Sequence, residues 1–290
     1  MSIAYFLSHN GLGDNISNIG AIRYLLNGYY DEIYFLCKDT NLVNLKLIYN
    51  SMRVHLIPVD SRDEMKEYTR ILAPIYLMEN VDILVTGFCL SPHYKSKINN
   101  QKLLTHKKIQ CYRIQPRFDF IRSIYEEMHL DLSVYYTYFQ IDSTPNSLTL
   151  YDDIKQYNII FVHTQSSNIS IDLSDNFKHL IDNEATLIVC ADHNVYPPNN
   201  GHYILADKYI NKPVSDYIDI IYNASQIYVV DSSFSTIIIP LMNMGKLKAI
   251  ECNIFDRKDK RQIDWSFKID RHTHHAIMDM MNQAMHLSMS

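Results

Sequence analysis

Short apolar runs that alternate with longer amphipathic segments are the feature that most constrains how this chain can fold. The runs are rich in β-branched and aromatic residues and almost continuously apolar, which is typical of parallel strands covered on both faces. The segments between them have the spacing of amphipathic helices. In the first half we expect strands at residues 3–7, 32–37, 54–59, 82–88 and 109–114, and helices at 15–27, 41–52 and 64–77.

The alternation stops at residues 141–153, which read IDSTPNSLTLYDD, and then begins again. Serine, threonine, proline, asparagine and acidic residues in this stretch are typical of a linker. Beyond it we expect strands at 158–163, 186–190, 203–206, 226–230 and 247–251, and helices at 173–181, 214–224 and 234–244.

Two runs of strand–helix alternation predict an α/β protein with two Rossmann-like, doubly wound lobes that face one another across a cleft. The 290 residues suffice for two lobes of about 140 residues each. We expect an N-terminal lobe at 1–145, a C-terminal lobe at 151–265, and a C-terminal helix at 266–290 that packs back across the lobes. Ligands of such lobes bind at the carboxyl ends of the strands.

A turn with two of the chain's seven glycines follows the first strand, at residues 8–15 (SHNGLGDN). Glycine tolerates positive φ and lets a ligand approach the backbone, and the next helix offers free N–H groups. The dinucleotide fingerprint is incomplete because Ile16 stands at the third glycine position. Asp14 has two compatible interpretations, as the N-cap of the helix or as a base that accepts a proton from a hydroxyl.

The segment NGLGDNISNIGAIRYLL, followed by DEIYFLC, resembles the opening of the heptosyltransferase-like (family 9) glycosyltransferases. The resemblance covers about 35 residues. It implies a two-lobed GT-B fold, with Asp14 as the general base that activates an acceptor hydroxyl. The neighbouring His9, Asn10, Gly11 and Gly13 would then bind the acceptor, and the N-terminal lobe would be the acceptor side.

Hydroxyl residues also follow a strand of the second lobe. Thr164, Ser166 and Ser167 come after residues 158–163 and could donate hydrogen bonds to phosphate oxygens, or form an ordinary polar turn. In the family that this chain resembles, the equivalent loop carries hydroxyl residues and a lysine that bind the donor diphosphate. Here Lys178 lies further along the chain, so the charge of a diphosphate lacks its usual partner.

The segment QIYVVDSSFSTIIIPLMNMG at residues 226–245 combines a strand end and a helix start at Asp231, Ser232 and Ser233. The serine hydroxyls and the helix N–H groups could hold a diphosphate, or the serines could simply cap a core helix. The segment resembles the donor-phosphate segment of inverting GT-B enzymes. It departs from that pattern at Phe234 and Ser235, where glycine and histidine are common.

Asp192 follows the strand expected at 186–190. At the rim of the cleft it could contact the base or ribose of a nucleotide, or it could belong to a surface loop. These residues make the C-terminal lobe the expected nucleotide-sugar side.

Composition excludes several other functions. A net charge of −5 without a basic cluster argues against a nucleic-acid partner, and no apolar run approaches the roughly 20 residues of a membrane span. We expect a cytoplasmic protein with free, buried thiols at Cys37, Cys89, Cys111, Cys190 and Cys252, because none form a CxxC pair and no signal peptide is visible. Abundant Ile, Asn and Tyr with few Gly suggest a viral or intracellular bacterial origin.

A metal and a bound cofactor are not expected. The histidines at 272, 274 and 275 lack a further ligand at suitable spacing, so a solvated helix start is the simpler interpretation. The predicted activity is transfer of a sugar from a nucleotide-diphosphate sugar to a glycan or glycoside hydroxyl, with inversion. The alternatives are a nucleotide-sugar epimerase and a non-catalytic nucleotide-binding module. The sequence makes no statement on the oligomeric state.

Overall fold

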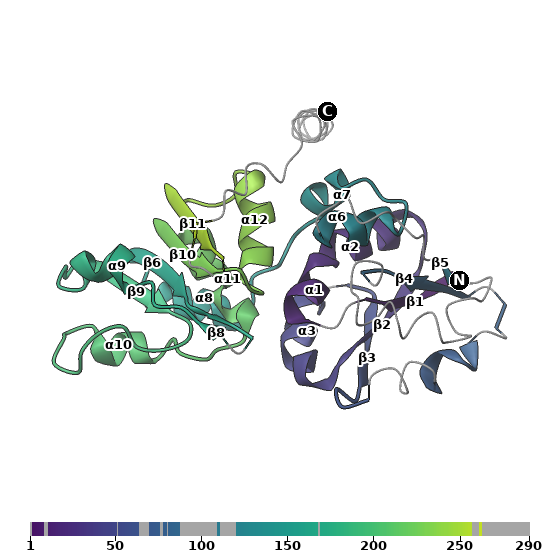
Figure 1. The fold of residues 1–290 in the computed structure, drawn as a ribbon, viewed down its shortest axis with the longest axis horizontal. Coiled ribbons are helices and arrows are strands. Elements are labelled where there is room, and N and C mark those ends of the chain that lie inside the picture. Colours follow the sequence, from purple (N-terminus) through teal and green to yellow (C-terminus); the bar gives the residue numbers. More distant parts are fainter. Residues whose placement is uncertain are drawn as a thin grey trace. The chain divides into compact units, whose positions relative to one another are not determined.

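A computed structural model of the chain contains two α/β units (Figure 1). The first unit ends at Gln140 and the second begins at Ile141. The structure describes residues 2–8, 11–50, 52–63, 70–75, 78–79, 81–87, 109–110, 120–167, 169–256 and 261–262.

The first unit is built on a parallel sheet in the order β3-β2-β1-β4-β5. The first strand lies in the middle, with Phe6 level with Phe35 on one side and Leu84 on the other. The strands are β1 (Ile3–Leu7), β2 (Glu32–Lys38), β3 (Val54–Val59), β4 (Val81–Val85) and β5 (Ile109–Gln110). The described helices are α1 (Leu12–Ser17), α2 (Ile19–Gly28), the 3₁₀ turn η1 (Asp39–Asn41), α3 (Leu42–Ile48), α6 (Phe120–Glu126) and α7 (Ser133–Thr137).

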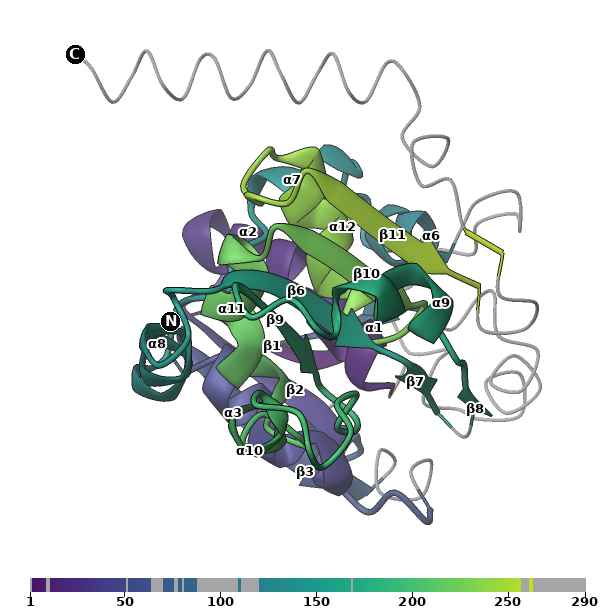
Figure 2. The ribbon, with the colours of Figure 1, turned by 90° about the vertical axis from the view of Figure 1, so that its left-hand side faces the viewer.

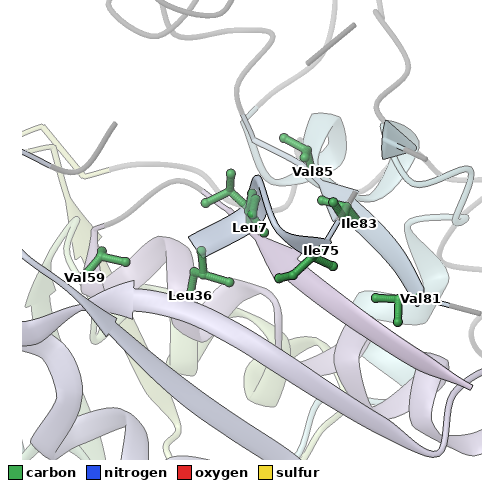
Figure 3. Close-up of a cluster of buried hydrophobic side chains, with 8 residues drawn as sticks. Leu7, Leu36, Val59, Ile75, Val81, Ile83 and Val85 are labelled. Atoms are coloured by element: carbon green, nitrogen blue, oxygen red, sulfur yellow. The ribbon is translucent and has the colours of Figure 1, made fainter. Parts of the chain in front are cut away.

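The strands β1, β2 and β4 are mostly buried, which explains why they are almost continuously apolar, whereas β3 at the edge is buried only at Val59. Neighbouring residues of a strand point to opposite faces, so Phe6 and Leu7 belong to different cores. Phe6 packs edge-on against Phe35, with ring centroids 5.3 Å apart. On the opposite face, buried aliphatic side chains of four strands form one cluster (Figure 3). Its members include Leu7, Leu36, Val59, Val81, Ile83 and Val85.

The helix expected at residues 15–27 is interrupted at Asn18 and forms two helices, α1 and α2. The interruption has a physical cause: the buried hydroxyl of Tyr125 lies between a carbonyl and the amide four residues later. It donates to the Ser17 carbonyl oxygen at 2.7 Å and accepts from the Ala21 N–H at 3.2 Å. A side chain inserted into the i→i−4 ladder is an established cause of helix breaks. Gly20 allows this approach, since a Cβ there would lie 2.9 Å from the Tyr125 hydroxyl oxygen.

The second unit has a parallel sheet in the order β11-β10-β6-β9, with a short antiparallel pair, β7 and β8, beyond the end of β6 (Figure 2). Its main strands are β6 (Asn158–His163), β9 (Thr186–Cys190), β10 (Gln226–Val230) and β11 (Glu251–Phe255), and the pair is β7 (Gln165–Ser166) and β8 (Ile169–Ser170). Its helices are α8 (Pro145–Asp152), α9 (Ser174–Phe177), α10 (Tyr203–Asp207), α11 (Ile218–Asn223) and α12 (Ser235–Asn243), with 3₁₀ turns η4 (Lys178–Leu180) and η5 (Val214–Tyr217).

The prediction of a linker at residues 141–153 is wrong, because most of this segment forms helix α8. Thr144 caps this helix by accepting from the Ser147 N–H at 3.0 Å, and Pro145 occupies its first turn. The Ser147 hydroxyl in turn donates to the Asp219 carboxylate, which ties α8 to α11, and its oxygen lies 3.0 Å from the Thr144 carbonyl oxygen. Proline, serine and threonine therefore act here as helix-start residues, a role that the same residues share with turns.

Two strand predictions in the second unit are also wrong. Residues 203–206 form helix α10, because a run of four apolar residues does not distinguish a strand from a buried helix turn. The last strand is β11, several residues after the expected 247–251, and its register pairs Glu251 with Gln226. Ile250, inside the expected strand, is 95% exposed.

Some predictions fall on residues outside the described ranges. These are the helix at 266–290, most of the helix at 64–77, the last residue of the strand at 82–88, the end of the strand at 109–114, and the thiols of Cys89 and Cys111. Among the described cysteines, Cys37 and Cys190 are buried and Cys252 is half-buried, all as free thiols. The helices in the described part of the chain are too short or too polar to span a bilayer.

Candidate functional site

In each unit, the first strand lies where the direction of winding changes. β1 has β2 on one side and β4 on the other, and β6 lies between β10 and β9. Loops from such neighbouring strands leave in opposite directions, which creates a crevice at the carboxyl ends of the strands. The predicted site residues follow these strand ends: Gly11, Gly13 and Asp14 after β1, Thr164, Ser166 and Ser167 after β6, Asp192 after β9, and Asp231, Ser232 and Ser233 after β10.

The turn after β1 places Asp14 in the first turn of α1. The N-cap of the helix is Gly11, and Asp14 is its third helical residue, so the prediction of Asp14 as N-cap is wrong by position. Asp14 still serves the helix start, because its Oδ2 accepts from the Gly11 N–H at 3.1 Å. Gly13 lies inside α1 and not in the turn. His9 and Asn10 lie outside the described residues.

Glycine at position 11 leaves room for the Asp14 carboxylate and does not adopt an unusual φ. Its φ is −65°, which any residue adopts, whereas a Cβ would lie 2.5 Å from Asp14 Oδ2. The turn is also held from beneath by Asn18, whose amide donates to the Ser8 hydroxyl and to the Asp14 carbonyl oxygen, both at 2.8 Å. The Asp14 carboxylate is therefore half-buried in a turn fixed by buried polar side chains.

In the second unit, Asp192 joins the ends of β6 and β9. Its Oδ2 accepts from the backbone N–H groups of Thr164 at 2.5 Å and Gln165 at 3.2 Å, and from the Thr164 hydroxyl at 3.2 Å. Its Oδ1 lies 3.2 Å from His163 Nε2. Burial acts to raise the pKa of the Asp192 carboxyl, but His163 and Thr164 outweigh burial and hold the pKa below its usual value. Asp192 is thus an ionised carboxylate that organises the strand ends.

His163 continues this network to the third strand. Its Nδ1 lies 3.1 Å from the hydroxyl oxygen of Ser232, which follows β10. Its ring packs on Phe234, with centroids 4.5 Å apart, and Phe234 also contacts Phe161 and Tyr217. Phe234 thus packs against the imidazole that lies between Ser232 and Asp192.

The turn that opens α12 is held by serine hydroxyls. Ser235 is the first residue of the helix, and its hydroxyl lies 2.9 Å from Asp231 Oδ1 and accepts from the Ser232 N–H at 3.0 Å. The predicted capping serines do not cap the helix, since its N-cap is Phe234 without a side-chain bond. The Ser166 hydroxyl donates to the Asp231 carbonyl oxygen at 2.8 Å.

The predicted donor residues therefore differ in accessibility. Thr164 and Ser166 are buried and bind within the protein, whereas Ser232 and Ser233 are half-buried at the start of α12. Ser167 is exposed, with a φ of 53°. The first turn of an α-helix presents backbone N–H groups without intrahelical partners and attracts anions. The accessible part of this edge is a serine-rich helix start.

Cys190, Asp192 and His193 offer atoms within 4.8 Å of one another and are the one group of this kind found among the described residues. Both oxygens of Asp192 already accept hydrogen bonds from β6 and the residues after it. Burial raises the pKa of the Cys190 thiol to about 11. The contacts of Asp192 place it in the hydrogen-bond network of the strand ends.

Sequence reasoning missed His163 and gave Ser235 little weight. His163 is the last residue of an otherwise apolar strand, which is a signal that could have identified it. Ser235 lies four residues after Asp231, the spacing that brings two side chains together across one turn. Both residues hold predicted site residues in place.

Comparison of the structure with solved structures identifies the fold. A family 9 glycosyl transferase from Veillonella parvula aligns over 97% of this chain and 96% of its own, with a TM-score of 0.54 and 10% identity. The ADP-heptose lipopolysaccharide heptosyltransferase II of E. coli aligns over 97% of this chain and 100% of its own, with a TM-score of 0.53 and 12% identity. No protein-family model and no curated protein sequence matches the chain.

At these identities the likeness concerns the fold. It confirms the predicted class, two α/β units with parallel sheets as in the GT-B glycosyltransferases.

Proposed function

We propose that this protein is a glycosyltransferase that moves a sugar from a nucleotide-diphosphate sugar to an acceptor hydroxyl, with inversion and without a metal. The observation that carries the proposal is the serine-rich start of α12 at the carboxyl edge of β6 and β10. A solved structure of the same fold is named for an ADP-heptose substrate, which supports a nucleotide-diphosphate donor. The protein would act in the cytoplasm.

The donor diphosphate would lie at the turn from Asp231 to Ser235. Ser232 and Ser233 are accessible there, and the N-terminal end of the helix supplies a partial positive charge. When the bond between sugar and diphosphate breaks, negative charge grows on the leaving phosphate oxygen. Donors that are already oriented toward that oxygen stabilise the transition state without reorganising.

Asp14 would act as the base on the acceptor side. The acceptor oxygen attacks the anomeric carbon and its proton passes to Asp14, while the electron pair of the broken C–O bond leaves with the diphosphate. One oxygen of Asp14 accepts from the Gly11 N–H, which orients the carboxylate. Gly11 would lie near the acceptor, and the same role is proposed for His9, Asn10 and Gly13.

The test begins with a thermal-shift panel of nucleotide sugars. A ligand present at 100 times its dissociation constant adds about 2.7 kcal/mol to stability, so a true donor should be evident. Turnover is then measured as release of the nucleoside diphosphate, with water and with a panel of glycosides as acceptors.

Two substitutions of Asp14 separate its roles. Asp14→Asn keeps an oxygen for the Gly11 N–H but cannot take a proton, whereas Asp14→Ala loses both. We expect both variants to bind the donor like wild type and to lose turnover by about 100-fold or more. Asp63→Asn, on an exposed turn residue, serves as the control and should keep full turnover. Turnover of donor that needs no acceptor and leaves an isomerised nucleotide sugar would instead indicate an epimerase, and binding without any turnover a binding module.

A further inference from the structure

Three polar side chains from three strand ends form one line in the second unit. Ser232 follows β10, His163 ends β6 and Asp192 follows β9. The hydroxyl oxygen of Ser232 lies 3.1 Å from His163 Nδ1, and His163 Nε2 lies 3.2 Å from Asp192 Oδ1. The side chains of His163 and Asp192 are only 10% and 7% exposed, so water competes little for these bonds.

Whether His163 Nε2 carries a proton is determined by its hydrogen-bond partner, Asp192. An ionised carboxylate only accepts hydrogen bonds, and Asp192 is kept ionised by its contacts with His163 and Thr164. Nε2 must therefore carry a proton and donate it to Asp192 in both forms of the imidazole. The protonation state of Nδ1 is the single variable of the line.

The Ser232 hydroxyl responds to that variable. Its oxygen also accepts from the Phe234 N–H at 3.3 Å. A hydroxyl has one donor and two acceptor positions. When Nδ1 has no proton, Ser232 must give its only proton to Nδ1, and it turns a lone pair toward solvent. When Nδ1 carries a proton, both lone pairs of Ser232 accept, and the hydroxyl proton is free to point outward.

We infer that His163 is a positioning residue that takes up one proton when a diphosphate binds at the start of α12, so that Ser232 turns to donate to it. The inference rests on the proposed function, because the diphosphate is that of the donor sugar. The protonated imidazole also brings a positive charge near the anion. Lys178, the nearest candidate by sequence, is exposed and instead forms an ion pair with Asp175 at 2.5 Å.

Other titratable groups lie on the elements packed around His163. On β9 and its turn these are Cys190, Asp192 and His193; Asp231 lies at the end of β10 and Tyr217 on η5. Burial raises the pKa of Cys190 to about 11 and that of Tyr217 higher still, so both stay neutral near pH 7. Asp231 Oδ1 pairs with the Ser235 hydroxyl, and His193 lies beside Cys190 at 3.7 Å.

The experiment uses UDP-glucose, ADP-glucose and GDP-mannose, whose diphosphate diesters keep a constant charge near neutral pH. Titration calorimetry of the full chain from about pH 5.5 to 8.5 gives the dissociation constant. With uptake of one proton, the dissociation constant should rise by up to about tenfold per pH unit on the alkaline side. Buffers of different ionisation enthalpy give the number of protons taken up, which should approach one.

Matched variants isolate the line of three side chains. In His163→Asn an amide nitrogen can donate to Ser232 at every pH, and in His163→Gln it can reach Asp192 but not Ser232. In both variants the dissociation constant of the nucleotide sugar should no longer depend on pH, and His163→Gln should also bind more weakly than wild type at acidic pH. The dissociation constant of Ser232→Ala should not change with pH, whereas that of Ser232→Thr should change with pH as in wild type. His193→Gln, which alters a neighbouring histidine outside the line, should behave like wild type.

A spectroscopic measurement makes the test independent of how well the variants fold. In wild type labelled with ¹⁵N-histidine, the bound nucleotide sugar should shift the signal of His163 Nδ1 from an acceptor to a protonated nitrogen. Binding that has the wild-type slope in His163→Gln, or that leaves Nδ1 unprotonated, would overturn the inference while leaving the proposed function intact. If none of the three nucleotide sugars binds, the proposed function itself fails for these donors and the inference fails with it.

Discussion

The Tyr125 hydroxyl should contribute more to stability than an ordinary buried tyrosine hydroxyl. It satisfies two backbone groups, the Ser17 carbonyl and the Ala21 N–H, at full burial. Burial raises its pKa well above the ordinary value, so it remains a donor over the whole range of useful pH. The Tyr49 hydroxyl is a matched control, since it is equally buried but makes one bond, to the Asn15 carbonyl oxygen at 2.8 Å.

An unsatisfied buried polar group costs about 1–3 kcal/mol. Tyr125→Phe leaves two such groups and should lower the free energy of unfolding of the first unit by about 2–6 kcal/mol. Tyr49→Phe leaves one, and the Asn15 carbonyl keeps a bond from the Asn18 N–H at 3.3 Å, so about 1 kcal/mol is expected.

Urea unfolding followed by circular dichroism measures the loss, and hydrogen exchange of peptides from α2 assigns it to the first unit, because two units need not unfold together. Equal effects of the two substitutions, or unchanged exchange at Ala21 in Tyr125→Phe, would refute the inserted hydroxyl as the cause of the helix break.

Three further predictions concern stability and reactivity. Thr144→Ala removes the cap of α8 and should cost about 1–2 kcal/mol in urea unfolding, whereas Thr149→Ala on the exposed face of the same helix should change stability by less than about 0.5 kcal/mol. Burial raises the pKa of Cys37 to about 12 and that of Cys190 to about 11, so iodoacetamide at pH 8 should modify these thiols only after the protein unfolds. Mass spectrometry measures the modification, and rapid alkylation of the native protein would contradict the burial of the two thiols. The lowered pKa of Asp192 stabilises the fold at pH values above the ordinary carboxyl pKa of about 4, and this stabilisation should disappear as the pH falls through the lower pKa of the folded state. The free energy of unfolding of Asp192→Asn should therefore depend less on acid pH than that of wild type.

Five strands could be predicted from the sequence to the residue, whereas β4 (Val81–Val85) was expected at 82–88 and β11 (Glu251–Phe255) at 247–251. β1, β3, β6, β9 and β10 have the expected bounds, because a parallel strand covered on both faces must be apolar throughout and polar residues mark its ends. Predictions failed where local chemistry is shared by two structures. Thr144 and Pro145 suit a linker as well as a helix start, and the run at residues 203–206 suits a strand as well as a helix.

Features that depend on distant residues could not be predicted. The break between α1 and α2 is caused by a tyrosine more than a hundred residues away from the amide that it binds. The line from Ser232 through His163 to Asp192 joins three strand ends that are far apart in the sequence. Motif reasoning located Ser232 and Asp192 individually, but only the strand order β10-β6-β9 brings His163 between them.

That strand order has a consequence for the newly made chain. The carboxyl edge of this sheet joins Asp192 after β9 to Ser232 after β10, and the Asp231 N–H is held by the carbonyl of Phe255 at the end of β11. During synthesis, the Asp231 N–H therefore lacks this hydrogen bond until residue 255 has left the ribosome. Products that stop earlier lack a strand of the sheet, and the turn after β10 would be held less firmly in them.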